Sequence, residues 1–98
     1  MTLQEITTKM KEGAAKKSSF GSTVKFSTDQ GVVYIDGNAN PPAVSNDDKP
    51  ADCTLKMAFS DFDDMINGKL DGMTAFMTGK LKIEGDMGVA MKLQSILR

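Results

Sequence analysis

The sequence contains no histidine and a single cysteine, Cys53, in 98 residues. Without histidine, neither a Ser-His-Asp triad, nor a Cys-His pair, nor a histidine-ligated metal site can be built. A lone cysteine cannot form an internal disulfide, which favours a reducing compartment. Cys53 also falls on the apolar side of a predicted strand, so we expect a buried small hydrophobic residue there and not a nucleophile. We therefore predict that the chain is not an enzyme.

The sequence also lacks an excess of basic charge, because it contains 12 Lys and Arg residues and 13 Asp and Glu residues. A nucleic-acid-binding protein usually carries a basic patch, so we expect no nucleic-acid partner. The densest basic feature is the pair Lys16-Lys17, and we expect at most transient membrane contact. The sequence has no signal-peptide pattern, no apolar run of about 20 residues and no S-K-L ending. We expect a cytoplasmic protein.

Motifs for nucleotides and metals are missing as well. Neither a P-loop nor a dinucleotide-binding glycine motif occurs between a strand and a helix. The acidic residues Asp61, Asp63 and Asp64 suggest a calcium loop, but an EF-hand needs glycine at its sixth position and glutamate at its twelfth. Counted from Asp61, those positions hold Ile66 and Gly72. We therefore expect no metal and no cofactor, and we assign the aspartates to the first turn of a helix.

The first half of the chain predicts one helix and then strands. Thr2 and Glu5 form a capping box, and apolar residues recur every three or four positions, which predicts a helix over 2–17. Strands follow around Val24–Phe26 and at Val32–Ile35, the second of which is apolar on both faces and is expected to be central. The Pro41-Pro42 pair allows at best an edge strand over 39–44. Apolar and polar residues alternate over 53–57, which predicts a half-buried strand.

The second half predicts two short helices, a strand and a final helix. Ser60 is the expected cap of the first helix, and Gly68 its end. Asp71 is the expected start of the second helix, and Gly79 its end. Residues 80–84 alternate as a strand, and Asp86 is the expected cap of a helix over 87–97. The order of elements predicts a single α/β (α+β) domain over 1–98, with helices covering one face of one sheet.

Methionine is in surplus, with 8 residues of 98. Methionine suits surfaces that adapt to different apolar shapes, although composition alone favours an ordinary methionine-filled core. The last predicted helix changes that weighting, because its apolar residues cover well over half of its circumference. These residues are Met87, Val89, Ala90, Met91, Leu93, Ile96 and Leu97. A domain of this size cannot surround such a helix, so we expect another subunit, a membrane or a ligand to cover it.

The second half of the chain resembles the sterol carrier protein family. The resemblance starts at Ala51-Asp52-Cys53-Thr54-Leu55, passes through Phe62 and Gly68-Lys69-Leu70-Asp71, and includes Ala90-Met91-Lys92-Leu93. Its strongest segment is Ala75-Phe76-Met77-Thr78-Gly79-Lys80-Leu81-Lys82-Ile83-Glu84-Gly85-Asp86-Met87-Gly88. Family members often have proline at the position of Gly72 and glutamine at that of Thr78. If the position of Thr78 meets the ligand, we expect a different ligand choice in this chain.

The resemblance implies a five-stranded sheet with helices over one face, enclosing a hydrophobic tunnel. It implies a non-enzymatic carrier that binds fatty acid, fatty acyl-CoA or sterol-like lipids. We predict that the last helix acts as a lid hinged near Gly85 and Gly88. The side chains predicted to line the tunnel are Phe76, Met77, Ile83, Met87, Met91 and Leu93.

Two alternatives remain open at this stage. The apolar last helix would also suit a protein–protein interaction module, or an accessory module of an enzyme, that docks a partner protein or a second copy of the chain, although we expect a monomer. Lys80 and Lys82 suit a lipid head group, but they equally suit the solvated face of a strand.

Overall fold

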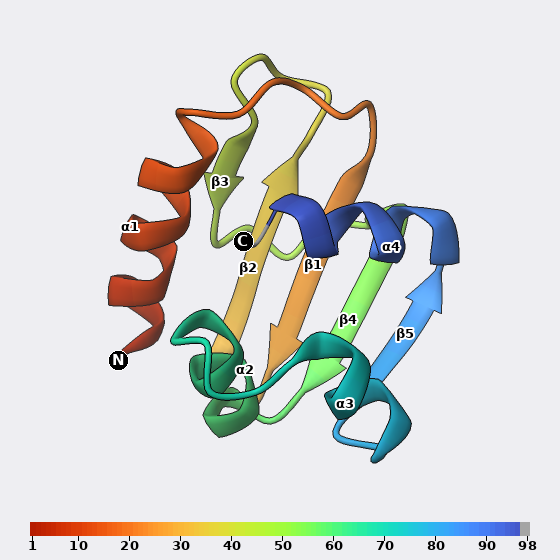
Figure 1. The fold of residues 1–98 in the computed structure, drawn as a ribbon. Helices are drawn as coiled ribbons and strands as arrows, with labels where there is room; N and C mark the ends of the chain where they lie inside the picture. The colour runs from red at the N-terminus through yellow and green to blue at the C-terminus, as the bar shows by residue number, and fades with distance from the viewer. Residues whose placement is uncertain (97–98) are drawn as a thin grey trace.

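The computed structural model describes residues 1–96, with side chains through Lys92. The chain forms a mixed α/β structure in which helices precede, interrupt and follow the strands (Figure 1). The elements in order are α1 (Leu3–Ala14), β1 (Thr23–Thr28), β2 (Gly31–Asp36), β3 (Ala43–Ser45), β4 (Cys53–Met57), α2 (Phe59–Ile66), α3 (Gly72–Met77), β5 (Leu81–Gly85) and α4 (Met87–Ile96). This order is the one that the sequence predicts.

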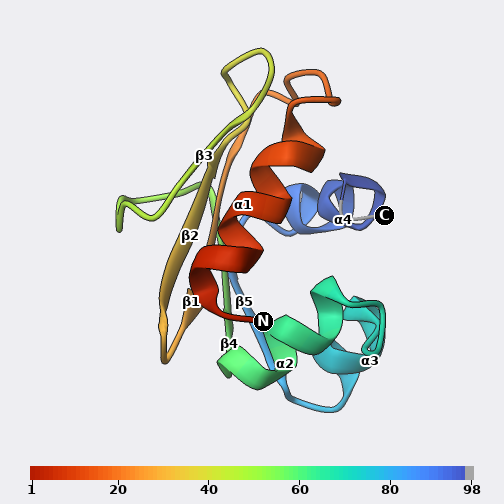
Figure 2. The ribbon, with the colours of Figure 1, turned by 90° about the vertical axis from the view of Figure 1, so that its left-hand side faces the viewer.

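The five strands form one sheet in the order β3-β2-β1-β4-β5. The pair β1–β4 is parallel, and the other neighbouring pairs are antiparallel. Seen edge-on, the sheet has α1, α2, α3 and α4 on the same side (Figure 2). The predicted fold class, a five-stranded sheet with helices over one face, is confirmed.

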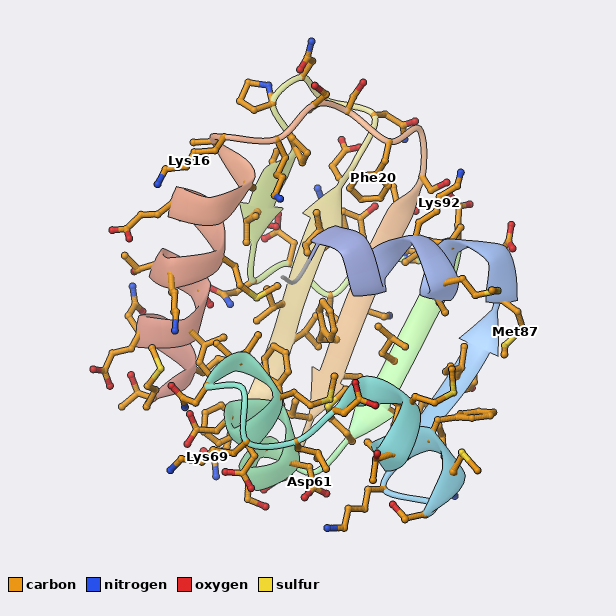
Figure 3. All side chains as sticks on the ribbon, viewed as in Figure 1. Lys16, Phe20, Asp61, Lys69, Met87 and Lys92 are labelled. Carbon is orange, nitrogen blue, oxygen red and sulfur yellow. The ribbon has the colours of Figure 1, made fainter. Side chains whose placement is uncertain are left out.

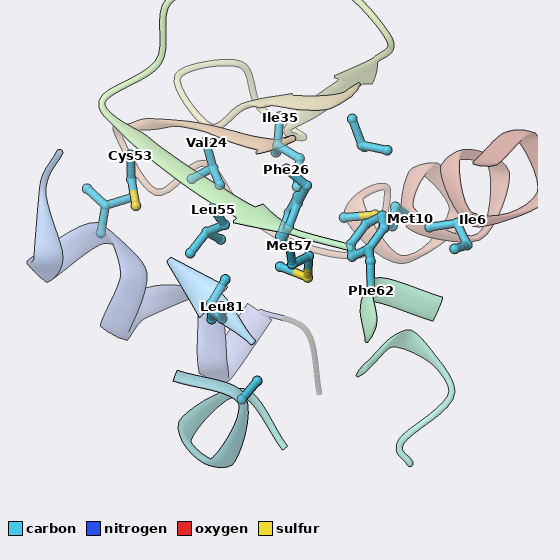
Figure 4. Packing of buried hydrophobic residues seen from close by; sticks show 13 residues of the cluster. Ile6, Met10, Val24, Phe26, Ile35, Cys53, Leu55, Met57, Phe62 and Leu81 are labelled. Atoms are coloured by element: carbon cyan, nitrogen blue, oxygen red, sulfur yellow. The ribbon is translucent and has the colours of Figure 1, made fainter. Parts of the chain in front are cut away.

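The core lies between this face of the sheet and the helices (Figure 4). Strand residues alternate in orientation, so every second residue of β1, β2, β4 and β5 points into it. Phe62 of α2 is fully buried, and its ring stacks on that of Phe26 with centroids 4.9 Å apart. The buried core residues are Ile6, Met10, Val24, Phe26, Val33, Ile35, Cys53, Leu55, Met57, Phe62, Ala75, Leu81 and Val89.

The opposite face of the sheet is covered in part by the loop between β3 and β4. The hydroxyl of Tyr34 donates to the carbonyl oxygen of Pro50 over 3.5 Å, and Lys49 Nζ lies 5.7 Å from the centre of the Tyr34 ring. Lys25 Nζ pairs with Asp48 at 2.9 Å. This loop explains why β2 is apolar on both faces without being the middle strand. The expectation that β2 is central is confirmed, because β2 lies between β3 and β1, although the middle position of the sheet belongs to β1.

Two helix starts show what local patterns can and cannot predict. The capping box of α1 is confirmed, since Glu5 N donates to Thr2 Oγ1 over 3.1 Å and Thr2 N donates to Glu5 Oε1 over 2.8 Å. The predicted cap Ser60 is wrong, because α2 already begins at Phe59. The amide of Phe59 donates to Asp29 Oδ1 over 2.7 Å. Its partner lies in the β1–β2 turn, so no local motif marks it.

Candidate functional site

A cavity of about 540 Å³ lies between the sheet and helices α2, α3 and α4. Its volume falls in the range of about 300–1,000 Å³ that is usual for small-molecule sites. Strands β1, β4 and β5 form its floor, and the three helices with the α2–α3 connection form its walls. Figure 1 shows how these helices lie over the three strands. The lining residues are Phe26, Leu55, Met65, Ile66, Gly68, Leu70, Asp71, Gly72, Met73, Phe76, Leu81, Ile83, Met87, Ala90 and Met91. Apart from Asp71 and the two glycines, the lining residues have apolar side chains.

Helix α3, at the edge of the cavity, begins and ends with local polar contacts. The Asp71 carboxylate accepts a hydrogen bond from Thr74 N at 3.2 Å, and this caps the helix at its start. At the other end, the Thr78 hydroxyl donates to Thr74 O over 2.8 Å. Ala75 faces the core, while Met73 and Phe76 line the cavity. The predicted start at Asp71 is confirmed.

Helix α4 is fixed at its first turn. Gly88 N donates to Asp86 Oδ1 over 2.8 Å, and Asp86 N donates to the carbonyl oxygen of Asp52 over 2.9 Å. The preceding Gly85 has a φ of 97°, and a Cβ there would lie 2.3 Å from the same Asp52 oxygen. Only glycine allows this close approach and this conformation. The turn into α4 is thus specified by Gly85, and Val89 is the buried anchor of the helix in the core.

The mouth of the cavity carries large apolar side chains that remain exposed to water. Met73, Phe76 and Met87 are 51%, 44% and 49% exposed, and Met91 is 74% exposed. Each of them also lines the cavity. Figure 3 shows such side chains projecting between α3 and α4, with Met87 at the first turn of α4. Exposed apolar residues that gather around a cavity mark a binding site more often than scattered ones do.

Four of the six predicted tunnel residues line the cavity: Phe76, Ile83, Met87 and Met91. The structure places Met77 differently, since it is 77% exposed and is not part of the cavity wall. The helical turn of α3 explains the difference, because adjacent helical residues point about 100° apart. The Leu93 side chain lies outside the described side chains, as do those of Ile96 and Leu97.

The sequence reasoning missed the floor and the α2 side of the cavity. Phe26, Leu55 and Leu81 lie on the helix-facing side of predicted strands, and Met65 and Leu70 follow in and after α2. Strand alternation places the first three side chains on this face. Alternation cannot separate a residue that packs against protein from one that faces a hollow, because both are apolar and point the same way.

Charged groups are concentrated away from the cavity wall. Lys82 and Glu84 lie on the outer face of β5, and Lys56 Nζ pairs with Glu84 Oε1 at 2.8 Å. This hydrogen bond and the lysine charge lower the pKa of the Glu84 carboxyl. Burial raises the pKa of the Cys53 thiol, in keeping with a protonated core residue. Among the described lining residues, Asp71 alone has an ionisable side chain.

The described residues form neither a metal-binding cluster nor a membrane-spanning helix. Within the described residues, no three His, Cys, Asp or Glu side chains are grouped so that they hold a metal ion. No helix in this part of the structure combines the length and the apolar character needed to cross a bilayer.

Known proteins match the chain both in sequence and in structure. A family model described as the SCP-2 sterol transfer family matches residues 3–98. Sterol carrier protein 2 from Homo sapiens is 51% identical over 59 residues, which are 60% of this chain. Those residues are 11% of that relative, so the chain corresponds to a small part of its length.

Solved structures share the fold over nearly the whole chain. The sterol carrier protein domain 2 of Helicoverpa armigera has a TM-score of 0.79 at 25% identity, and the match covers 96% of this chain and 84% of that one. Palmitated SCP2L2 from Aedes aegypti has a TM-score of 0.75 at 18% identity, with 100% and 96% covered. At 18% identity the second likeness shows the fold alone.

Proposed function

The chain belongs to the SCP-2 sterol transfer family, and from this premise we propose that it is a non-enzymatic carrier whose cavity holds the apolar part of one lipid molecule. Membership supports lipid or sterol binding and transfer in general terms. The finer proposal is that the ligand is a fatty acid, a fatty acyl-CoA or a sterol-like lipid. Activities of the longer relatives are not carried over, because the match covers a small part of them.

The apolar cavity with exposed methionines at its mouth is the observation that carries this proposal. Burial of each methylene group contributes about 0.8 kcal/mol, so an acyl chain of about 16 carbons gains on the order of 12 kcal/mol before costs. Association and ordering costs remove much of this, which leaves affinity in the micromolar range. Apolar burial has no direction, so we expect weak discrimination among apolar chains of similar size.

We propose that Phe76, Ile83, Met87 and Met91 contact the lipid. Unbranched methionine side chains adjust to differently shaped apolar groups, which suits a carrier with several ligands. We further propose that α4 moves as a lid about Gly85 and Gly88, and that residues 1–98 act as one domain. The buried single cysteine supports a cytoplasmic location.

An interaction module is the less favoured alternative. Met87, Ala90 and Met91 of α4 turn toward a cavity, so the surface they offer is concave and suits a small guest more than a flat partner surface. We therefore propose a monomeric carrier. A lipid-free dimer that buries α4, detected by sedimentation, would favour the alternative.

Titration of the delipidated protein with a pyrene-labelled dodecanol tests the carrier function. We expect saturable binding in the micromolar range and a higher melting temperature with the lipid. Ala90→Phe places a bulky ring in the cavity wall, and we expect affinity to fall at least about tenfold. Met77→Phe is the matched control outside the wall, and its affinity should stay within about twofold of the wild type.

Ala90 is partly buried against the core, so Ala90→Phe acts on folding as well as on binding. Met91 is exposed, so Met91→Lys provides a second variant whose charge stays in water. It too should weaken binding while leaving the folded state intact, as judged by circular dichroism. The proposal would be contradicted if the wild type showed no saturable binding. It would also be contradicted if both cavity variants bound the probe as tightly as the wild type does.

A further inference from the structure

We infer that the cavity selects lipids with an uncharged head, such as a hydroxyl or an ester, over lipids that end in a carboxylate, and that Asp71 contributes to this selection. The inference rests on the proposed carrier function and narrows its ligand class. It is carried by the charge of the cavity wall. Among the described lining residues, none is basic and one, Asp71, is acidic.

A carboxylate head cannot be placed favourably at the inner end of the cavity. The floor there is built from Phe26, Leu55 and Leu81, all of which belong to the buried core. Within the described part of the chain, these side chains offer neither a cation nor a hydrogen-bond donor. An ionised carboxylate taken out of water without a partner carries a large desolvation cost. A hydroxyl or an ester at the same place carries a much smaller one.

The opposite orientation leaves the head at the mouth, beside Asp71. This residue is exposed at the start of α3 and forms part of the cavity wall. Its carboxylate already caps α3 through Thr74 N at 3.2 Å. A carboxylate has further acceptor capacity, so it can accept a hydrogen bond from a lipid hydroxyl. A lipid carboxylate at this position meets a like charge instead.

Nearby lysines do not reverse this balance. Lys69 lies between the lining residues Gly68 and Leu70, Lys80 precedes Leu81 and Lys92 follows Met91, but these three lysines are exposed and do not form part of the wall. Figure 3 shows Lys69 beside α2 at the lower edge of the molecule. Lys82 lies on the outer face of β5, away from the helices. Exposed charges are screened by salt, so their attraction for a head group in the cavity is weak.

A matched pair of probes tests the inference, namely pyrene-labelled dodecanol and pyrene-labelled dodecanoate at neutral pH. We expect the wild type to bind the alcohol about tenfold more tightly than the acid. The preference is no larger because water at the mouth screens part of the electrostatic penalty on the acid. Asp71→Asn keeps a good helix cap and removes the charge. It should strengthen binding of the acid about threefold and leave or slightly weaken binding of the alcohol.

Asp61→Asn is the control for the change in net charge, since Asp61 lies in the first turn of α2 and is not part of the wall. It should leave the ratio of the two affinities unchanged. If both probes bind equally tightly to the wild type, or if Asp71→Asn leaves their ratio unchanged, the inference is overturned while the carrier function stands. If neither probe binds, the carrier function itself fails.

Discussion

The helix-covered face of the sheet is packed in two different ways along its width. Toward α1 and α2, the large side chains Ile6, Val33 and Phe62 are fully buried. Toward α3 and α4, large apolar residues stay in contact with water, with Met91 as the most exposed lining residue. We call the first region the solid end and the second the hollow end.

The side chains of the two ends differ in kind as well as in burial. The solid end uses branched and aromatic residues, which have few rotamers and fill a fixed shape. At the hollow end, three of the four exposed lining residues, Met73, Met87 and Met91, are methionines, which change shape with little cost. This difference teaches that the fold is stabilised mainly at one end, so the other end is left free to open around a guest. Core substitutions should therefore separate stability from binding.

The largest effect is expected from a truncation at the solid end. Phe62→Ala removes a fully buried ring that stacks on Phe26, and it should lower the free energy of unfolding by about 3–5 kcal/mol. Met91→Ala removes an exposed side chain, and it should lower that free energy by less than about 0.5 kcal/mol. Urea denaturation followed by circular dichroism measures both values.

The same two variants should rank in the opposite order in lipid binding. Under conditions where both variants are folded, Met91→Ala should lower the affinity for pyrene-labelled dodecanol more than Phe62→Ala does. The reason is that Met91 lines the cavity and Phe62 does not. Equal losses of stability in the two variants would remove the distinction between a solid and a hollow end.

An intermediate effect is expected at the turn that joins the two layers of the hollow end. Gly85→Ala forces a positive φ on alanine and drives its Cβ against the Asp52 carbonyl oxygen. We expect a loss of about 2–4 kcal/mol, with α4 displaced from the sheet. Gly79→Ala is the matched control, because its φ is 80° but the space around it is open.

The control variant isolates the cost of the backbone conformation, and it should lose only about 1 kcal/mol. Denaturation gives both stabilities, and amide hydrogen exchange in α4 gives the displacement. A Gly85→Ala variant no less stable than Gly79→Ala would mean that the contact with Asp52 does not fix α4.

Much of this arrangement can be predicted from the sequence. The predictions that fail do so for physical reasons. Periodicity predicts the order of all the elements, and Asp71 and Asp86 mark helix starts through local contacts. The start of α2 depends on Asp29, which is distant in sequence, so a local pattern misplaces it at Ser60.

The cavity is subject to a similar limit. An apolar excess in α4 predicts that something must cover that helix, and four lining residues fall where the sequence places them. Met77 does not, because its apolar character is the same on either side of α3 and only the helical angle decides which way it points. Whether apolar residues meet or leave a hollow depends on how helices sit on the sheet, and that information is not local.

The smallest effect is expected on the outer face of the hollow end, where Lys56 and Glu84 pair across β4 and β5 at 2.8 Å. Because Lys56 lowers the pKa of Glu84, the pair stabilises the fold above the ordinary pKa of a carboxyl group. That contribution is lost as the pH falls through the lowered pKa, when Glu84 takes up a proton. Lys56→Gln should therefore lower the melting temperature slightly at neutral pH and not at all in strong acid. Lys80→Gln removes the same charge elsewhere, and its difference in melting temperature from the wild type should not disappear in acid in this way. If the difference between Lys56→Gln and the wild type stayed constant across the pH range, the pair with Glu84 would not be its cause.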